Sequence, residues 1–143
     1  MKNIVIINEQ HSLMKDQERV LKNLDGEVIT VNVPARGWTK KQMDEEILSI
    51  LEKLGWKIKK YKERVSLTAT SKKTGRVIFV SPIPYMMLRL RDHSLFGDHQ
   101  GGLMECFEVK AFHNDRREKK EVPNGDGGTR IINTVAKDGW ELV

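Results

Sequence analysis

The chain has 143 residues, of which 38% are hydrophobic, and this suits one α/β domain over residues 1–143 with a core of its own. Its one cysteine, Cys106, excludes an intrachain disulfide and fits a reducing compartment, so the cytoplasm is the expected location. No apolar run approaches the roughly 20 residues of a membrane helix, so no membrane partner is expected. The formal net charge of +5 favours partners that carry phosphate.

A short apolar run and an amphipathic stretch open the chain. Residues 4–7 are all Ile or Val, which is typical of a strand buried on both faces and predicts a central place in a sheet. Residues 13–24 place apolar side chains on one helical stripe. Ser12 is the expected cap of that helix.

A second strand and helix follow directly. Residues 28–33 have the β-branched character of a strand. Thr39 with Gln42 three residues later matches a capping box, and the helix that it predicts ends at Gly55. Short links between these elements imply parallel strands joined by right-handed crossovers.

The middle of the chain changes character. A basic run over residues 57–64 precedes a stretch of alternating polar and apolar residues, and residues 64–80 are expected to form a β-hairpin. A helix is expected over residues 85–91. Residues 95–102 contain three glycines and are expected to form a loop.

The last third predicts further strands. An apolar strand is expected over residues 106–112, and the dense polar stretch 113–120 follows it. Residues 123–128 must form a loop, residues 129–136 a short helix and residues 140–143 a final strand. The whole pattern predicts an α/β fold, namely a Rossmann-like three-layer sandwich with a mixed, mainly parallel sheet.

Polar residues follow the expected strands at their carboxyl ends. Ligands of open α/β sheets bind at that edge, so these residues are expected to line one site. The candidate ligand-binding residues are Asn8, Gln10, Ser12, Arg36, Trp38, Ser81 and Asn114. The candidate catalytic residues are His11, His113 and Arg116.

Each type of candidate has a chemical reason and a plainer alternative. Hydroxyl groups near helix starts suit phosphate, but plain helix capping is the favoured role of Ser12, Thr39 and Ser81. Arg36 and Arg116 can hold phosphate in a forked geometry or be ordinary surface charges. The two candidate histidines can transfer protons near neutral pH or serve the structure alone.

No metal and no cofactor are expected. His93 and His99 lack the spacing of metal ligands, and the sequence has neither a P-loop nor a GxGxxG segment after its first strand. Trp38 and Trp140 can each stack on a base or serve as a packing anchor. The basic run 57–64 can contact a nucleic acid backbone or form a solvated strand edge.

Residues 4–7 lead into the segment Asn-Glu-Gln-His-Ser-Leu at 8–13, and Gln17 lies in the helix that follows. This pattern, together with the second strand and the loop 34–38, resembles the small Rossmann-like CRISPR-associated ring nucleases. The resemblance covers residues 3–54. The segment His113 to Lys120 has no counterpart in it.

The resemblance implies that the protein binds cyclic oligoadenylate, the second messenger of type III CRISPR defence, and acts as a homodimer. It also implies cleavage without metal, in which a ribose 2′-hydroxyl attacks the adjacent phosphate and leaves a cyclic phosphate end. Two alternatives stay open. One is a nucleotide-binding module without catalysis, and the other is an accessory protein that binds nucleic acid through residues 57–64.

Overall fold

The computed structural model describes residues 1–70, 72–95 and 105–143. In chain order the elements are β1 (Lys2–Asn8), α1 (Lys15–Lys22), β2 (Glu27–Val33), α2 (Lys40–Lys53), β3 (Lys57–Tyr61), β4 (Arg64–Thr68), β5 (Gly75–Phe79), α3 (Pro84–Ser94), β6 (Phe107–His113), β7 (Arg117–Pro123), β8 (Thr129–Val135) and β9 (Glu141–Leu142). Within those ranges, no helix is both long enough and apolar enough to cross a membrane.

Five strands form the main sheet in the order β2-β1-β5-β6-β9. The first four are parallel to one another, and β9 pairs antiparallel with β6, so the sheet is mixed. Strand β1 lies between β2 and β5, and residues 4–7 are buried. The apolar run therefore forms an interior strand, as expected, although β5 and not β1 occupies the centre of the sheet.

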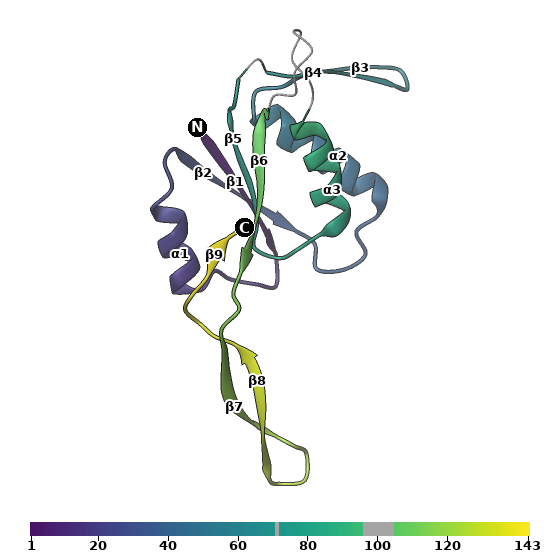
Figure 1. Cartoon of the computed structure of the whole chain (residues 1–143). Coiled ribbons are helices and arrows are strands. Elements are labelled where there is room, and N and C mark those ends of the chain that lie inside the picture. Colours follow the sequence, from purple (N-terminus) through teal and green to yellow (C-terminus); the bar gives the residue numbers. More distant parts are fainter. Residues whose placement is uncertain (71, 96–104) are drawn as a thin grey trace.

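Two apolar clusters hold helices against opposite faces of the sheet (Figure 1). The larger cluster joins α2 and α3 to one face through side chains such as Leu51 and Leu90. On the other face, Leu21 of α1 packs with Val5, Ile78 and Phe112. The loops that leave the strands toward these helices therefore meet at the carboxyl edge of the sheet.

The expectation of a Rossmann-like three-layer sandwich is wrong. The described residues form nine strands but only three helices, and four of the strands build two separate antiparallel sheets, β3-β4 and β7-β8. The face that carries α1 has one eight-residue helix, which covers only the half of the sheet nearest the carboxyl ends of its parallel strands. The β3-β4 and β7-β8 strands form hairpins that project from opposite ends of the main sheet (Figure 1).

The expectation of a hairpin over residues 64–80 is also wrong in its pairing. Strand β4 pairs with β3, which is the basic run itself, through a tight turn in which Lys62 adopts a φ of 54°. Strand β5 instead joins the main sheet parallel to β1. Gly75 permits this, because a Cβ at that position would lie 2.1 Å from the carbonyl oxygen of Lys2.

The expectation of a short helix over residues 129–136 is wrong as well. Residues 129–135 form β8, which pairs with β7 along its full length. Five of these seven residues are Thr, Ile or Val, whose branched side chains favour strands over helices. The predicted loop 95–102 lies, apart from Leu95, outside the described residues.

The predicted cap is confirmed at α2 and is wrong at α1. The capping box at α2 is confirmed, because Thr39 Oγ1 accepts from Gln42 N at 3.2 Å and Gln42 Oε1 accepts from Thr39 N at 2.9 Å. The expectation that Ser12 caps α1 is wrong, because the cap is Met14. The Met14 amide donates to Gln17 Oε1 at 3.0 Å, so this helix end is capped without the Ser12 hydroxyl.

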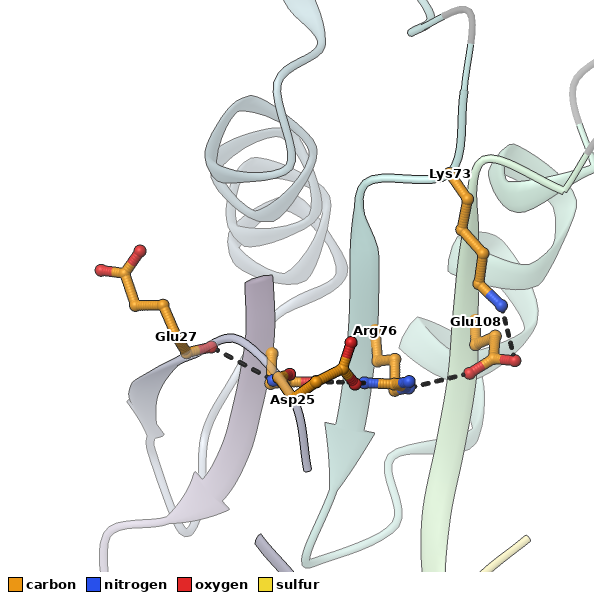
Figure 2. Close-up of polar contacts among 6 residues, drawn as sticks. Asp25, Glu27, Lys73, Arg76 and Glu108 are labelled. Carbon is orange, nitrogen blue, oxygen red and sulfur yellow. Dashed lines mark hydrogen bonds and ion pairs between the residues drawn. The ribbon is translucent and has the colours of Figure 1, made fainter. Parts of the chain in front are cut away.

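A polar network joins β1, β5 and β6 near the amino ends of these strands (Figure 2). Arg76 stands opposite Asn3 on one neighbouring strand and Glu108 on the other. Its Nη1 donates to Asn3 Oδ1 at 3.1 Å and to Asp25 Oδ1 at 3.1 Å, and its Nε donates to Glu108 Oε2 at 3.0 Å. Lys73 Nζ donates to the other Glu108 oxygen at 2.7 Å. These contacts link β1, β5 and β6 through polar side chains instead of apolar packing.

Candidate functional site

The crevice between β1 and β5 is the point where the connections of the sheet diverge. Strand β1 leads to α1 on one face, whereas β5 leads to α3 on the other face, and the two strands are direct neighbours. Such a divergence leaves an opening beyond the carboxyl ends of the strands, where ligands of open α/β sheets bind. The loops 9–14, 34–39 and 80–83 surround this opening.

His11 and Ser81 bridge the crevice. The Nδ1 atom of His11 lies 2.8 Å from Ser81 Oγ, so the loop after β1 is hydrogen-bonded to the loop after β5. A turn holds the histidine in place, because His11 N donates to the Asn8 carbonyl at 2.9 Å and Gln10 N donates to Asn8 Oδ1 at 2.8 Å. The imidazole is exposed, and its Nε2 has no hydrogen-bond partner among the described residues.

A hollow of about 350 Å³ lies on the side of the crevice that faces α2. We call it the α2-side hollow. It brings together four of the predicted ligand-binding residues, which are Asn8, Arg36, Trp38 and Ser81. Met43 and Ile83 add apolar wall to it, and Trp38 packs partly against the core. The hollow therefore combines a flat aromatic ring with a cation and a hydroxyl group.

A second hollow of about 470 Å³ lies on the side that faces α1. We call it the α1-side hollow. It is lined by the predicted residues Gln10, His11 and Ser12, and Ser81 and Pro82 line both hollows. The two spaces are therefore neighbours that meet at the loop after β5. An elongated or ring-shaped ligand that crosses Ser81 would reach both.

Arg36 is the cation best placed to meet an anion in the α2-side hollow. Its side chain is exposed and forms no ion pair with any described residue. The loop that carries it is tied to the loop after β1, because the Ala35 amide donates to Glu9 Oε1 at 3.3 Å. A guanidinium without a carboxylate partner is free to pair with phosphate.

The structure places His113, Asn114 and Arg116 outside both hollows. They lie where β6 gives way to the β7-β8 hairpin (Figure 1). His113 Nε2 contacts Asp115 Oδ1 at 2.5 Å, and Arg116 Nη1 pairs with Asp138 Oδ1 at 2.8 Å. Their predicted roles toward a ligand stay predictions.

Asn114 is buried and makes its hydrogen bonds inside the protein. Its Nδ2 donates to the carbonyl oxygens of Ala136 at 2.9 Å and Asp138 at 2.8 Å, and its Oδ1 accepts from Arg116 N at 3.0 Å. The side chain thus joins the strand before the hairpin to the segment after it. This arrangement fixes the base of the hairpin.

Trp140 is a wall of the α1-side hollow that the predicted site did not include. Its ring packs edge-on against Phe112 with centroids 6.3 Å apart, and its backbone amide donates to Asp16 Oδ2 at 2.8 Å. Hydrogen bonds from the Arg19 side chain and from this amide hold the pKa of Asp16 below its usual value. No local signal places Trp140 at this hollow, because its partners Phe112 and Asp16 lie 28 and 124 positions away in the chain.

Acid–base chemistry and phosphate binding are what these side chains can supply. The crevice offers an imidazole, two hydroxyl groups and a guanidinium, and within the described ranges no group of three or more His, Cys, Asp or Glu side chains is arranged to hold a metal ion. Comparisons of the chain with families of proteins, with curated proteins and with solved structures find no match. The crevice residues are therefore the basis for assigning a function.

Proposed function

We propose that the crevice between β1 and β5 binds cyclic oligoadenylate and that the protein is a ring nuclease that cleaves this ligand without metal. The observation that carries the proposal is the 2.8 Å contact between His11, whose exposed imidazole lines the α1-side hollow, and Ser81, which lines both hollows. The resemblance of residues 3–54 to ring nucleases supports the same assignment.

The two hollows suit successive nucleotides of one ligand. Trp38 offers a face for stacking an adenine base in the α2-side hollow, and Arg36 offers a forked donor for the phosphate that follows. Ser81 and Pro82 stand at the shared wall, so the phosphodiester between two nucleotides would pass close to the His11 and Ser81 side chains.

The reaction needs only alignment, charge neutralisation and proton transfer. The 2′-hydroxyl oxygen attacks the adjacent phosphorus, and the bond from phosphorus to the 5′ oxygen breaks. His11 accepts the proton of the 2′-hydroxyl, the departing 5′ oxygen takes a proton from water, and Arg36 stabilises the charge that grows on the phosphate. The products are a 2′,3′-cyclic phosphate and a 5′-hydroxyl.

The direct test is to incubate the purified full chain with labelled cyclic tetra-adenylate and cyclic hexa-adenylate in excess chelator. We expect linear products that end in a cyclic phosphate. Arg36→Ala should weaken ligand binding by about ten- to a hundredfold, because a hydrogen bond to a charged group contributes roughly 1.5–3 kcal/mol.

Lys22→Ala is the matched control, because Lys22 is an exposed cation on α1 and lines neither hollow. It should bind and cleave as the parent does. Binding of either ring without cleavage would support the nucleotide-binding module instead. If neither ring is bound or cut, the proposal is wrong.

A further inference from the structure

The β3-β4 hairpin carries most of the net charge of the protein. Residues 57–68 contain five cations, which are Lys57, Lys59, Lys60, Lys62 and Arg64, against the single carboxylate of Glu63. They therefore hold four of the five net positive charges of the chain. The hairpin lies at the opposite end of the sheet from the hairpin formed by β7 and β8 (Figure 1), and none of its residues lines the crevice.

The two faces of this hairpin differ in chemistry. Ile58 and its partner Leu67 are half-buried and pack against the main core cluster. Side chains alternate between the faces of a strand, so the opposite face carries the next residues along each strand. That outer face consists of Lys57, Lys59, Tyr61, Arg64, Ser66 and Thr68, and all six are exposed.

The outer face has the composition of a surface that follows a phosphate backbone. Lys57, Lys59 and Tyr61 alternate on β3, so successive side chains on this face stand about 6.6 Å apart. Arg64 lies directly opposite Tyr61, and Ser66 lies opposite Lys59. Cations thus recur at regular steps along the ribbon with hydroxyl groups beside them, and this favours a polyanion over a single small anion.

Tyr61 adds a stacking surface to these charges. Its side chain is 72% exposed, although a tyrosine in a monomeric domain normally covers part of its ring with neighbouring atoms. The Lys62 ammonium lies 5.6 Å from the ring centroid, so a cation stands beside the aromatic face. Exposed aromatic rings within basic surfaces are where single-stranded nucleic acids stack their bases, whereas bases inside a duplex are already stacked on one another.

We infer that the outer face of the β3-β4 hairpin is a binding site for single-stranded nucleic acid, separate from the crevice. Lys57, Lys59 and Arg64 contact successive phosphates, and Tyr61 stacks on an unpaired base. Ile58 and Leu67 anchor the base of the hairpin to the core, whereas Lys60 and Val65 nearer its turn are exposed. The inference does not depend on the ring-nuclease proposal.

Fluorescence anisotropy of the full chain with labelled 20-nucleotide single strands of RNA and DNA, from 50 to 200 mM salt, tests the inference. We expect binding that weakens steeply with salt. The triple variant Lys57→Gln, Lys59→Gln, Arg64→Gln should lower the affinity at 50 mM salt by at least about tenfold. It should also reduce the slope of log K against log salt by about 2, since each phosphate contact to a single strand contributes roughly 0.7.

Tyr61→Ala should weaken binding by about tenfold without changing the salt slope, and Tyr61→Phe should restore the affinity, because stacking needs the ring and not the hydroxyl group. The matched control is Lys119→Gln, Lys120→Gln, Arg130→Gln on the β7-β8 hairpin. It removes the same charge from equally exposed positions and should leave the affinity nearly unchanged.

Four results would overturn the inference. They are equal loss in the control variant, no effect of Tyr61→Ala, duplexes bound as tightly as single strands, and binding to phosphatidylserine vesicles without binding to either single strand. Circular dichroism of each variant distinguishes a lost contact from a lost fold. Unchanged binding of single strands by Arg36→Ala would show that this site is separate from the crevice, and an equal loss would refute the separation.

Discussion

The imidazole Nδ1 of His11 and the hydroxyl oxygen of Ser81 lie 2.8 Å apart, although 70 positions separate the two residues in the sequence. The contact joins loops that follow neighbouring parallel strands but lead to helices on opposite faces of the sheet. It holds the imidazole, which lines the α1-side hollow, against the residue that lines both hollows, and the catalytic prediction depends on this contact.

We predict that His11→Gln slows cleavage of cyclic oligoadenylate by about 10²- to 10⁴-fold and changes binding much less, because the lost group moves a proton. Ser81→Ala should slow cleavage by a smaller factor, since Ser81 positions the imidazole. A double-mutant cycle on single-turnover rates measures the coupling. Ser81→Ala should have almost no further effect once His11 is replaced.

His113→Gln serves as the comparison variant for this prediction. His113 contacts Asp115 and lines neither hollow, so its replacement should slow cleavage far less than that of His11. A loss at His113 as large as at His11 would assign the proton transfer to the hairpin base instead. Parent-like cleavage by both variants would exclude a histidine from the reaction.

Arg76→Met should destabilise the protein by about 1.5–3 kcal/mol, because Asn3 Oδ1 and Glu108 Oε2 lose hydrogen bonds from a largely buried guanidinium, and Glu108 keeps the hydrogen bond from Lys73. Urea denaturation followed by circular dichroism measures the change in the free energy of unfolding. Arg91→Met is the control, since Arg91 is exposed and lies outside the network. An equal effect of the two variants would contradict a role for the network.

The same network predicts how stability depends on pH. Hydrogen bonds from Lys73, and then from Arg76, hold the pKa of Glu108 below its ordinary value of 4.5, and Arg76 lowers the pKa of Asp25. A carboxyl whose pKa is lowered by folding stabilises the protein above its ordinary pKa, and this stabilisation is lost as the pH falls through the lowered value. We expect the free energy of unfolding to fall below about pH 4.5, and to fall less in Arg76→Met. Urea titrations from pH 7 to pH 3 test this, and identical slopes in both proteins would refute it.

Thr39→Ala should destabilise the protein by about 1 kcal/mol, because Thr39 Oγ1 caps α2 by accepting from the Gln42 amide. Ser12→Ala should change stability by less than about 0.5 kcal/mol, since Met14 is the residue at the start of α1 and Ser12 is exposed. Thermal and urea unfolding of the two variants side by side would reveal the difference. An equal loss of stability in both variants would mean that the Ser12 hydroxyl also caps a helix.

We predict that the protein is a homodimer. A cyclic ligand with rotational symmetry is held best by two copies of one set of loops around a two-fold axis. Sedimentation velocity at tens of micromolar protein, with and without cyclic tetra-adenylate, measures the mass. A monomer under both conditions would contradict the prediction and would require one crevice to hold the whole ring.

Local patterns along the chain determined several parts of this protein. The apolar run 4–7 marked an interior strand, because such a run is stable only when both faces of the strand are covered. The Thr39 and Gln42 pair marked the start of α2, since a capping box is built from residues within one turn. The polar residues after β1, β2 and β5 pointed to the crevice, because parallel strands end at one edge.

The tertiary structure alone decided which strands pair and which loops meet. The alternation in residues 64–68 fits pairing with either neighbour, and the choice of β3 depends on the turn at Lys62 and on the place that β1 offers to β5. Residues 113–116 follow a strand of the same sheet, yet the hairpin base uses Asn114 for its own hydrogen bonds. Trp140 reaches the α1-side hollow only because β9 pairs with β6 and Asp16 holds the Trp140 amide. A local sequence pattern indicates which type of element a segment forms and which face of it is buried. Which other segment packs against that face depends on the contacts available to all segments of the folded chain.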